Sequence, residues 1–270
     1  MNPASPRARP MGLTSRFLAT LCLVMALAAC GGGGPTRAVD LSGATRPADV
    51  AVLMMGNSHT VGAGLPARLQ ATLQAALPGR SVLVFVAPGS AFLDEHLHDD
   101  TTLALLGARR WQAVVLQAQK YSSSGQYSYS TAEAEELVRR SRAAGAVPVM
   151  FPEWARRGVD EADRIWALHA GIAGREPACV APIPQAWELA FADHTRLPLH
   201  AGDGNHAAPA GAQLTALVLM ATITGVSPAA LGDVPGGGNS TQQGHLRAAA
   251  VAALAQQDAR AFCPDDPLVR

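Results

Sequence analysis

Ser58 is the first residue whose type and position are suited to chemistry. It follows the apolar residues 51–55 and Gly56, and a glycine-bearing loop leads from it into a helix expected at about 65–76. Unpaired backbone N–H groups and the positive end of the helix dipole meet at such a place. They stabilise an oxygen that becomes negative during a reaction. Ser58 is therefore a candidate nucleophile; its alternative role is helix capping.

A matching base stands far along the chain, in the stretch GDGNHAAP at residues 202–209. A serine nucleophile needs a base within hydrogen-bond reach and a third group that orients the base. Asp203 and His206 are three residues apart on a flexible loop, so His206 can face Ser58 while Asp203 holds its other ring nitrogen. The sequence thus predicts a Ser58–His206–Asp203 site.

The elements that must position these residues alternate along the chain. Short apolar runs predict strands at 50–55, 81–87, 113–116, 147–151 and 179–183. Helices are expected at about 65–76, 93–106, after Thr131, 160–173, 209–224 and 241–261.

Strands that alternate with helices form right-handed β-α-β units. The predicted fold class is α/β, a three-layer α/β/α domain with a central parallel sheet of about five strands. Ligands of such sheets lie beyond the carboxyl ends of the strands. Ser58, Gly89, Gln117 and Gln119 all fall at such ends.

The first residues have the layout of a bacterial signal peptide. Three arginines precede an apolar run at 17–29, which is too short to span a bilayer. The run ends in Leu-Ala-Ala-Cys30, which looks like a lipobox, and four glycines follow. The expected organisation is a lipoprotein signal peptide at 1–29, a flexible tether at 30–47 with lipidated Cys30, and a catalytic domain at 48–270. An ordinary signal peptide with an incidental Cys30 is the alternative.

Charge and composition narrow the partners. The 270-residue chain has a formal net charge of zero, and loss of the three leader arginines leaves about −3. Lys120 is the only lysine and no basic patch occurs, so nucleic acid is not expected as a partner. Neither a nucleotide-binding glycine motif nor regular metal-ligand spacing is present, so no cofactor is predicted.

Several residues have two readings from sequence alone. Cys179 and Cys263 form a disulfide or stay as two buried thiols, and an oxidising compartment favours pairing. His96 and His98 lie among acidic residues, where a solvated helix start is favoured over a metal site. Trp154 lines the cleft or packs in the core.

Taken together, Gly56-Asn57-Ser58-His59 and Asp203-x-x-His206 resemble the blocks of the SGNH hydrolases, the GDSL-like esterase superfamily. The nearest resemblance is to a branch whose first block reads G-N-S-H-T. It runs from about Val50 to Pro228 and implies a flavodoxin-like strand order. By this similarity Ser58 is the nucleophile, His206 the base and Asp203 its orienting partner.

The same resemblance implies an oxyanion hole made of the Ser58 and Gly89 N–H groups and one side-chain amide. The superfamily usually supplies that amide from an asparagine after the third strand. This chain has Gln117-Ala118-Gln119 there. Gln117 is the preferred donor and Gln119 its alternative, because a glutamine carries the same amide on a longer arm.

The expected function is hydrolysis of an acyl ester, with an acetyl group on a glycan as the favoured substrate. The expected location is the bacterial cell envelope, periplasmic or outer-membrane, through the lipid anchor. Two alternatives remain open on the same fold: a lipoprotein that binds a glycan or ester without turnover, and an acyl transferase.

Overall fold

The computed structural model describes residues 41–192 and 197–270. The predicted signal peptide, Cys30 and residues 30–40 of the predicted tether lie outside the described residues. Residues 41–47, also assigned to the tether, form a turn in which the Thr45 N–H donates to the Leu41 carbonyl at 3.1 Å. Ala44 is fully buried, so this end of the expected tether packs on the domain.

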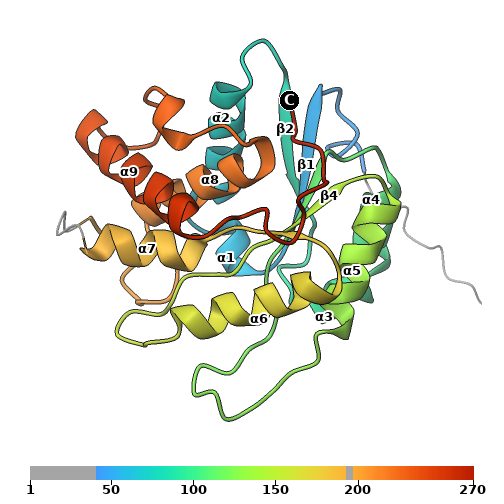
Figure 1. Ribbon diagram of the computed structural model, residues 1–270. Helices are drawn as coiled ribbons and strands as arrows, with labels where there is room; N and C mark the ends of the chain where they lie inside the picture. The colour runs from blue at the N-terminus through green and yellow to red at the C-terminus, as the bar shows by residue number, and fades with distance from the viewer. Residues whose placement is uncertain (1–40, 193–196) are drawn as a thin grey trace, which may run out of the picture. The chain divides into compact units, whose positions relative to one another are not determined.

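The core of the domain is a five-stranded parallel sheet with the order β2-β1-β3-β4-β5 (Figure 1). Its strands are β1 (Val50–Met55), β2 (Val82–Val86), β3 (Ala113–Leu116), β4 (Val147–Met150) and β5 (Cys179–Val180). The number of strands, their parallel pairing and the flavodoxin-like order confirm the predicted fold class. The continuous apolar runs are explained by helices that cover both faces of the sheet.

Two helix layers enclose this sheet (Figure 1). Helices α2, α7, α8 and α9 pack on one face and α3 to α6 on the other. Their bounds are α1 Ser58–Val61, α2 Leu65–Ala76, α3 Leu93–Leu97, α4 Asp100–Gly107, α5 Ala132–Ala143, α6 Ala162–Arg175, α7 Ile183–Ala192, α8 Pro209–Thr224 and α9 Ser240–Gln256, with 3₁₀ helices η1 Gly62–Gly64 and η2 Pro228–Ala230.

The first strand lies at the centre of both cores. All six of its residues are buried, and successive side chains point to opposite faces. Val52 and Met54 join the cluster under α2 and α8, whereas Leu53 and Met55 join the cluster under α4 and α5. Such a strand is rigid, so the residue that follows it is held at a fixed point.

The helix predicted at 93–106 is two helices. Asp99 interrupts it, because its carboxylate accepts the Thr102 N–H at 2.8 Å and so caps the start of α4. The last helix ends at Gln256, earlier than the predicted position 261.

The strand predicted at 179–183 is also wrong in extent. β5 contains only Cys179 and Val180, and Ile183 begins α7, a helix absent from the prediction. Pro184 is tolerated in the first helical turn. Trp187 on this helix stacks on Trp154 with ring centroids 4.3 Å apart. A short apolar run bounded by prolines is compatible with either a strand or a helix. The stacking of Trp187 on Trp154 favours the helix here.

The C-terminal tail is tied to the sheet edge. Cys179 in β5 and Cys263 beyond α9 form a disulfide with their Cα atoms 5.1 Å apart. Arg142 on α5 adds a two-fold ion pair with Asp266, at 2.6 and 2.7 Å. The pairing of the cysteines, left open by the sequence, is resolved as a bond.

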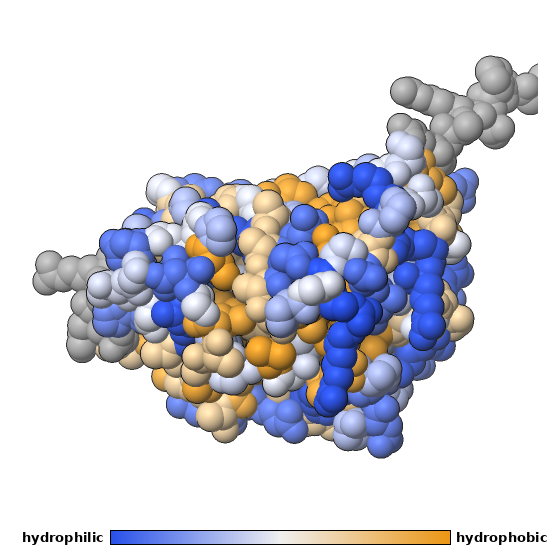
Figure 2. All heavy atoms as spheres, turned by 90° about the horizontal axis from the view of Figure 1, so that it is seen from above, coloured by the Kyte–Doolittle hydropathy of each residue, from blue (hydrophilic) through white to orange (hydrophobic). Residues whose placement is uncertain are grey.

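The face at the amino ends of the strands is covered by hydrophilic side chains interspersed with apolar ones (Figure 2), as solvent-facing surfaces of globular domains are. Among the described residues, no helix has both the length and the hydropathy needed to cross a bilayer.

A buried histidine gives the domain a defined acid sensitivity. His169 on α6 donates from Nδ1 to the Ile165 carbonyl at 2.8 Å, its Nε2 has no partner, and burial lowers its pKa to about 4. The folded protein keeps this ring neutral, whereas the unfolded chain binds a proton below pH of about 6.5. Stability is therefore lost as the pH falls from about 6.5 to about 4, by up to roughly 3 kcal/mol.

We expect His169→Leu to flatten this pH dependence. Urea unfolding followed by tryptophan fluorescence at pH 7 and pH 4.5 measures it. Parallel losses of unfolding free energy in wild type and variant would contradict the assignment.

Candidate active site

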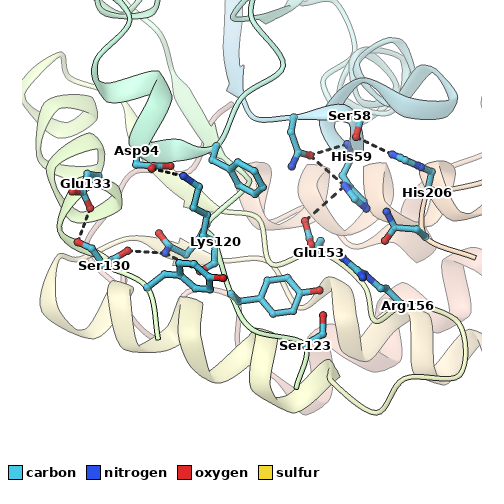
Figure 3. Close-up of a pocket in the computed structure, with 16 residues that line it drawn as sticks. Ser58, His59, Asp94, Lys120, Ser123, Ser130, Glu133, Glu153, Arg156 and His206 are labelled. Atoms are coloured by element: carbon cyan, nitrogen blue, oxygen red, sulfur yellow. Dashed lines mark hydrogen bonds and ion pairs between the residues drawn. The ribbon is translucent and has the colours of Figure 1, made fainter. Parts of the chain in front are cut away.

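Ser58, His206 and Asp203 form one hydrogen-bonded chain at the carboxyl edge of the sheet. Ser58 Oγ lies 2.8 Å from His206 Nε2 (Figure 3). His206 Nδ1 lies 2.6 Å from Asp203 Oδ2. The carboxylate can only accept, so Nδ1 carries the proton and Nε2 is free to take one from the serine. The structure thus brings together residues 148 positions apart, in the order that the spacing predicted.

The backbone that leads into Ser58 is clamped by two buried side chains. The Gly56 N–H donates to His96 Nε2 at 3.0 Å. Gln117 Oε1 accepts both the Asn57 N–H at 2.9 Å and the Thr60 hydroxyl at 2.7 Å. Both sides of the serine are therefore held by the third strand's exit and by α3.

Gly56 is required here because the neighbours approach its Cα closely. A Cβ on this residue would lie 2.1 Å from Thr60 Oγ1 and 2.3 Å from Gln117 Oε1, far inside van der Waals contact. The glycine that ends the apolar run thus allows the clamp to close over the strand.

His96 belongs to a hydrogen-bonded chain that ends at the carboxylate of Asp99. Because Nε2 accepts from Gly56, Nδ1 carries the proton and donates to Thr102 Oγ1 at 3.1 Å, and Thr102 in turn donates to Asp99 at 2.7 Å. His98 instead donates from Nδ1 to the carbonyl of Asp94 at 2.7 Å. His96 is buried, so the expectation of a solvated side chain is wrong for this residue. Its two ring nitrogens are bonded to Gly56 and Thr102, so His96 positions the Ser58 loop and neither nitrogen is free to bind a metal.

The loop that carries the base is ordered by its own acidic residue. Asp203 Oδ1 accepts the backbone N–H groups of Asn205 at 2.9 Å and His206 at 3.0 Å. The Trp154 indole donates to the Asn205 carbonyl at 2.8 Å. Trp154 is 2% exposed, so it packs in the core and supports the loop from below.

Hydrogen bonds keep Asp203 ionised. The imidazole of His206 is the largest cause, and with the two backbone N–H groups it holds the pKa of the Asp203 carboxyl well below its ordinary value. Half of this side chain is exposed. The charge that orients His206 is thus created by local geometry and not by burial.

The chain of three residues opens into a cavity of about 660 Å³. Its lining is polar and aromatic, and consists of Asn57, Ser58, His59, Phe92, Asp94, Gln119, Lys120, Tyr121, Ser123, Tyr129, Ser130, Glu133, Glu153, Arg156, Asn205 and His206. Figure 3 shows Ser58 and His206 on one side of the cavity and Asp94, Lys120, Ser130 and Glu133 on the other.

Charges in the cavity are distributed unevenly. Lys120 is paired with Asp94 at 2.5 Å, and that hydrogen bond raises the pKa of the lysine. Burial raises the pKa of Tyr121, so its phenol stays protonated. The Arg156 guanidinium has no hydrogen bond or ion pair with the described residues, which leaves it available to a substrate.

Comparison with known proteins supports the fold that carries this site. No protein-family model and no curated protein matches the chain. A solved structure of a predicted SGNH hydrolase from Slackia heliotrinireducens is similar to it, with 28% identity over 63% of this chain and 97% of that one, at a TM-score of 0.50. A DUF4886 family protein from Bacteroides uniformis shares the fold at a TM-score of 0.60, with 16% identity over 76% and 95% of the two chains.

The chain is thus similar in sequence and fold to the SGNH hydrolases. The similarity supports a hydrolase of this fold and does not define its substrate. Because fold alone does not fix function, the chemistry must be argued from the site.

The structure differs from the sequence expectation in the two glutamines. Gln117 is fully buried and does not line the cavity, and its Nε2 donates to Glu153 at 2.8 Å. Gln119 lines the cavity, but its Nε2 donates to the carbonyls of Lys120 at 3.0 Å and Ser130 at 2.9 Å. Neither amide is placed as an oxyanion donor requires: the first positions the Ser58 loop, and the second holds the loop at 120–130.

The predicted backbone donor at Gly89 lies in an exposed turn after β2. Its φ of +107° is one that glycine adopts readily. Gly89 is not among the residues that line the cavity, so its N–H stays a prediction from the resemblance. Ser58, by contrast, lines the cavity, and its N–H has no partner among the described residues. It is therefore available to an oxyanion.

The sequence analysis assigned no contacts to three residues of this site. Glu153 follows β4 directly, and its place at a strand exit is a usable signal. Thr60 and His59 belong to the first block; His59 stacks on His206 with ring centroids 4.9 Å apart. The contacts of Thr60 with Gln117 and of His59 with His206 join distant parts of the chain, so the local sequence does not predict them.

Gly56→Ala should misplace the serine. The new methyl group must displace Thr60 or Gln117, and a shift of about 1 Å at a reacting atom costs on the order of 10²-fold in rate. We expect kcat/KM for p-nitrophenyl acetate to fall by about this factor. Gly62→Ala is the matched control, because nothing lies within 4 Å of its Cβ. Equal activity of both variants would refute the clamp.

Proposed function

We propose that this protein is a serine esterase in which Ser58 is the nucleophile, His206 the general base and Asp203 the group that orients it. The hydrogen-bonded chain from Ser58 Oγ to Asp203 Oδ2, at 2.8 and 2.6 Å, is the observation that carries the proposal. A protein that only binds glycans or esters has no need of this arrangement, so it favours catalysis over the binding alternative.

The reaction proceeds in two halves. His206 Nε2 takes the Ser58 proton while Oγ bonds to the ester carbonyl carbon, and the carbonyl oxygen becomes an oxyanion beside the Ser58 N–H. Collapse breaks the bond to the leaving alcohol, which receives the proton from His206. Water then attacks the acyl-enzyme with the same base and releases the acid.

The cavity favours a short acyl group on a polar alcohol. Its lining holds hydroxyl, carboxylate and guanidinium groups. Among the described residues that line it, one is a phenylalanine, Phe92, and none has an aliphatic side chain. A long acyl chain needs an apolar channel to remove its surface from water. Tyr129 is 49% exposed at the cavity, where its ring can stack on a sugar. An acetyl ester on a glycan fits these features best.

We also assign the chain to the branch of the superfamily with a G-N-S-H-T first block. The support is the local role of each letter: Gly56 admits the clamp, Asn57 caps α1, and His59 packs beside the base. A transferase that passes the acyl group to a second glycan uses the same first half-reaction, and product analysis separates it from the hydrolase.

Ser58→Ala and His206→Ala should each lower kcat for p-nitrophenyl acetate by a factor on the order of 10⁴–10⁶, and the double variant should lose little more. Asp203→Ala should cost less, since Asp203 orients the base without reacting. Ser240→Ala, which also replaces the first residue of a helix, is the matched control. Labelling of Ser58 by a fluorophosphonate is the direct test. An unlabelled wild type, or an active Ser58→Ala variant, would exclude the mechanism.

We propose further that the mature protein is anchored in the bacterial cell envelope, at the periplasmic or outer membrane, by acyl chains on Cys30. The lipobox pattern before Cys30 supports this. A disulfide between Cys179 and Cys263 suits the same oxidising compartment.

Cys30→Ala should move the protein from the membrane fraction to the soluble fraction and abolish labelling with a palmitate analogue. Cys22→Ala is the matched control, because residue 22 lies in the segment that is removed. A Cys30→Ala variant that stays membrane-bound after removal of the signal would contradict the anchor.

A further inference from the structure

An ester hydrolase of this kind needs side-chain or backbone donors for the oxyanion, and the two glutamines do not provide one. The unpaired Ser58 N–H supplies a single donor on the nucleophile itself. Preorganised sites normally aim two or more donors at the developing charge. Besides the Gly89 N–H predicted from the resemblance, the side-chain amide that the glutamines do not supply can come from another residue beside Ser58 in the cavity.

Asn57 lies next to Ser58 and lines the same cavity. Its Oδ1 accepts the His59 N–H at 3.0 Å and lies 3.2 Å from His59 Nδ1. A backbone N–H can only donate, so this contact identifies the oxygen and fixes which end of the carboxamide is Nδ2. The amide is thereby held in one orientation.

The other end of this amide is free. Asn57 Nδ2 makes no hydrogen bond to the described residues, and it is not among their buried polar atoms without a partner. Its nitrogen is therefore open to solvent with two N–H groups unused, on a residue that lines the cavity. The backbone N–H of Asn57 is bonded to Gln117, so the residue is fixed at both its main chain and its side chain.

We propose that Asn57 is a catalytic residue whose Nδ2 donates to the oxyanion, together with the Ser58 N–H. This role rests on the proposed esterase function. The capping contact to His59 holds the amide before the substrate arrives, so no reorganisation is needed as charge develops. Asn57 thus has two functions at once: its oxygen caps α1 and its nitrogen serves the reaction.

Asn205 is the rival donor. It also lines the cavity, next to His206, and its side chain makes no hydrogen bond to the described residues. Nothing holds its amide in one orientation, whereas that of Asn57 is fixed by His59. A fixed dipole stabilises charge more than one that must turn to meet it, so we favour Asn57.

Asn57→Ser and Asn57→Asp test this assignment because both keep an oxygen that caps a helix as well as asparagine does, and both remove the amide donor. We expect each to lower kcat by roughly 10²–10³-fold with little change in KM. Affinity for an alkyl boronic acid, which forms a tetrahedral anion on Ser58, should fall in parallel. Asn239→Ser is the matched control, since Asn239 caps α9 in the same way.

The outcomes separate the possibilities. Wild-type kcat and boronate affinity in Asn57→Ser, at an unchanged melting temperature, would overturn the role of Asn57. A loss confined to Asn205→Ala would overturn it in favour of that rival. A wild type that neither hydrolyses p-nitrophenyl acetate nor reacts with a fluorophosphonate would instead refute the esterase function itself.

Discussion

The position of the nucleophile depends on one buried carbonyl oxygen, Oε1 of Gln117. It accepts from the main chain before Ser58 and from the hydroxyl of Thr60 after it, while the nitrogen of the same amide is held by Glu153. A buried amide is stable only when its groups are paired. Each of these partners is therefore needed by the others, and the loop between them has little freedom to move.

The loop before Ser58 is clamped by neutral side chains, whereas the ionised Asp203 lies where water can reach it. His96 and Gln117 are almost wholly buried and uncharged, but Asp203 is half exposed and ionised. A buried carboxylate would pay a large desolvation cost. The exposed loop avoids this cost and keeps its shape through backbone hydrogen bonds to the same carboxylate that orients His206.

The strand pattern and the order of the candidate catalytic residues were predictable because they depend on local regularities. Continuous apolar runs specify buried strands, and alternation with helices limits the topology to a few right-handed arrangements. The split at Asp99 and the helix at Ile183 were not predictable. Capping and the stacking of Trp187 on Trp154 decide them, and periodicity over so few residues does not.

The sequence by itself determined which residue types meet at the carboxyl edge: a serine after a strand, and an Asp-x-x-His loop near the other end of the domain. Only the tertiary structure decided what the polar residues around them do. Gln117 and Gln119 have the right chemistry for an oxyanion donor, but a glutamine amide points where its hydrogen-bond partners hold it. Those partners, Glu153 and the 120–130 loop, come from distant parts of the chain, and their positions are set by packing.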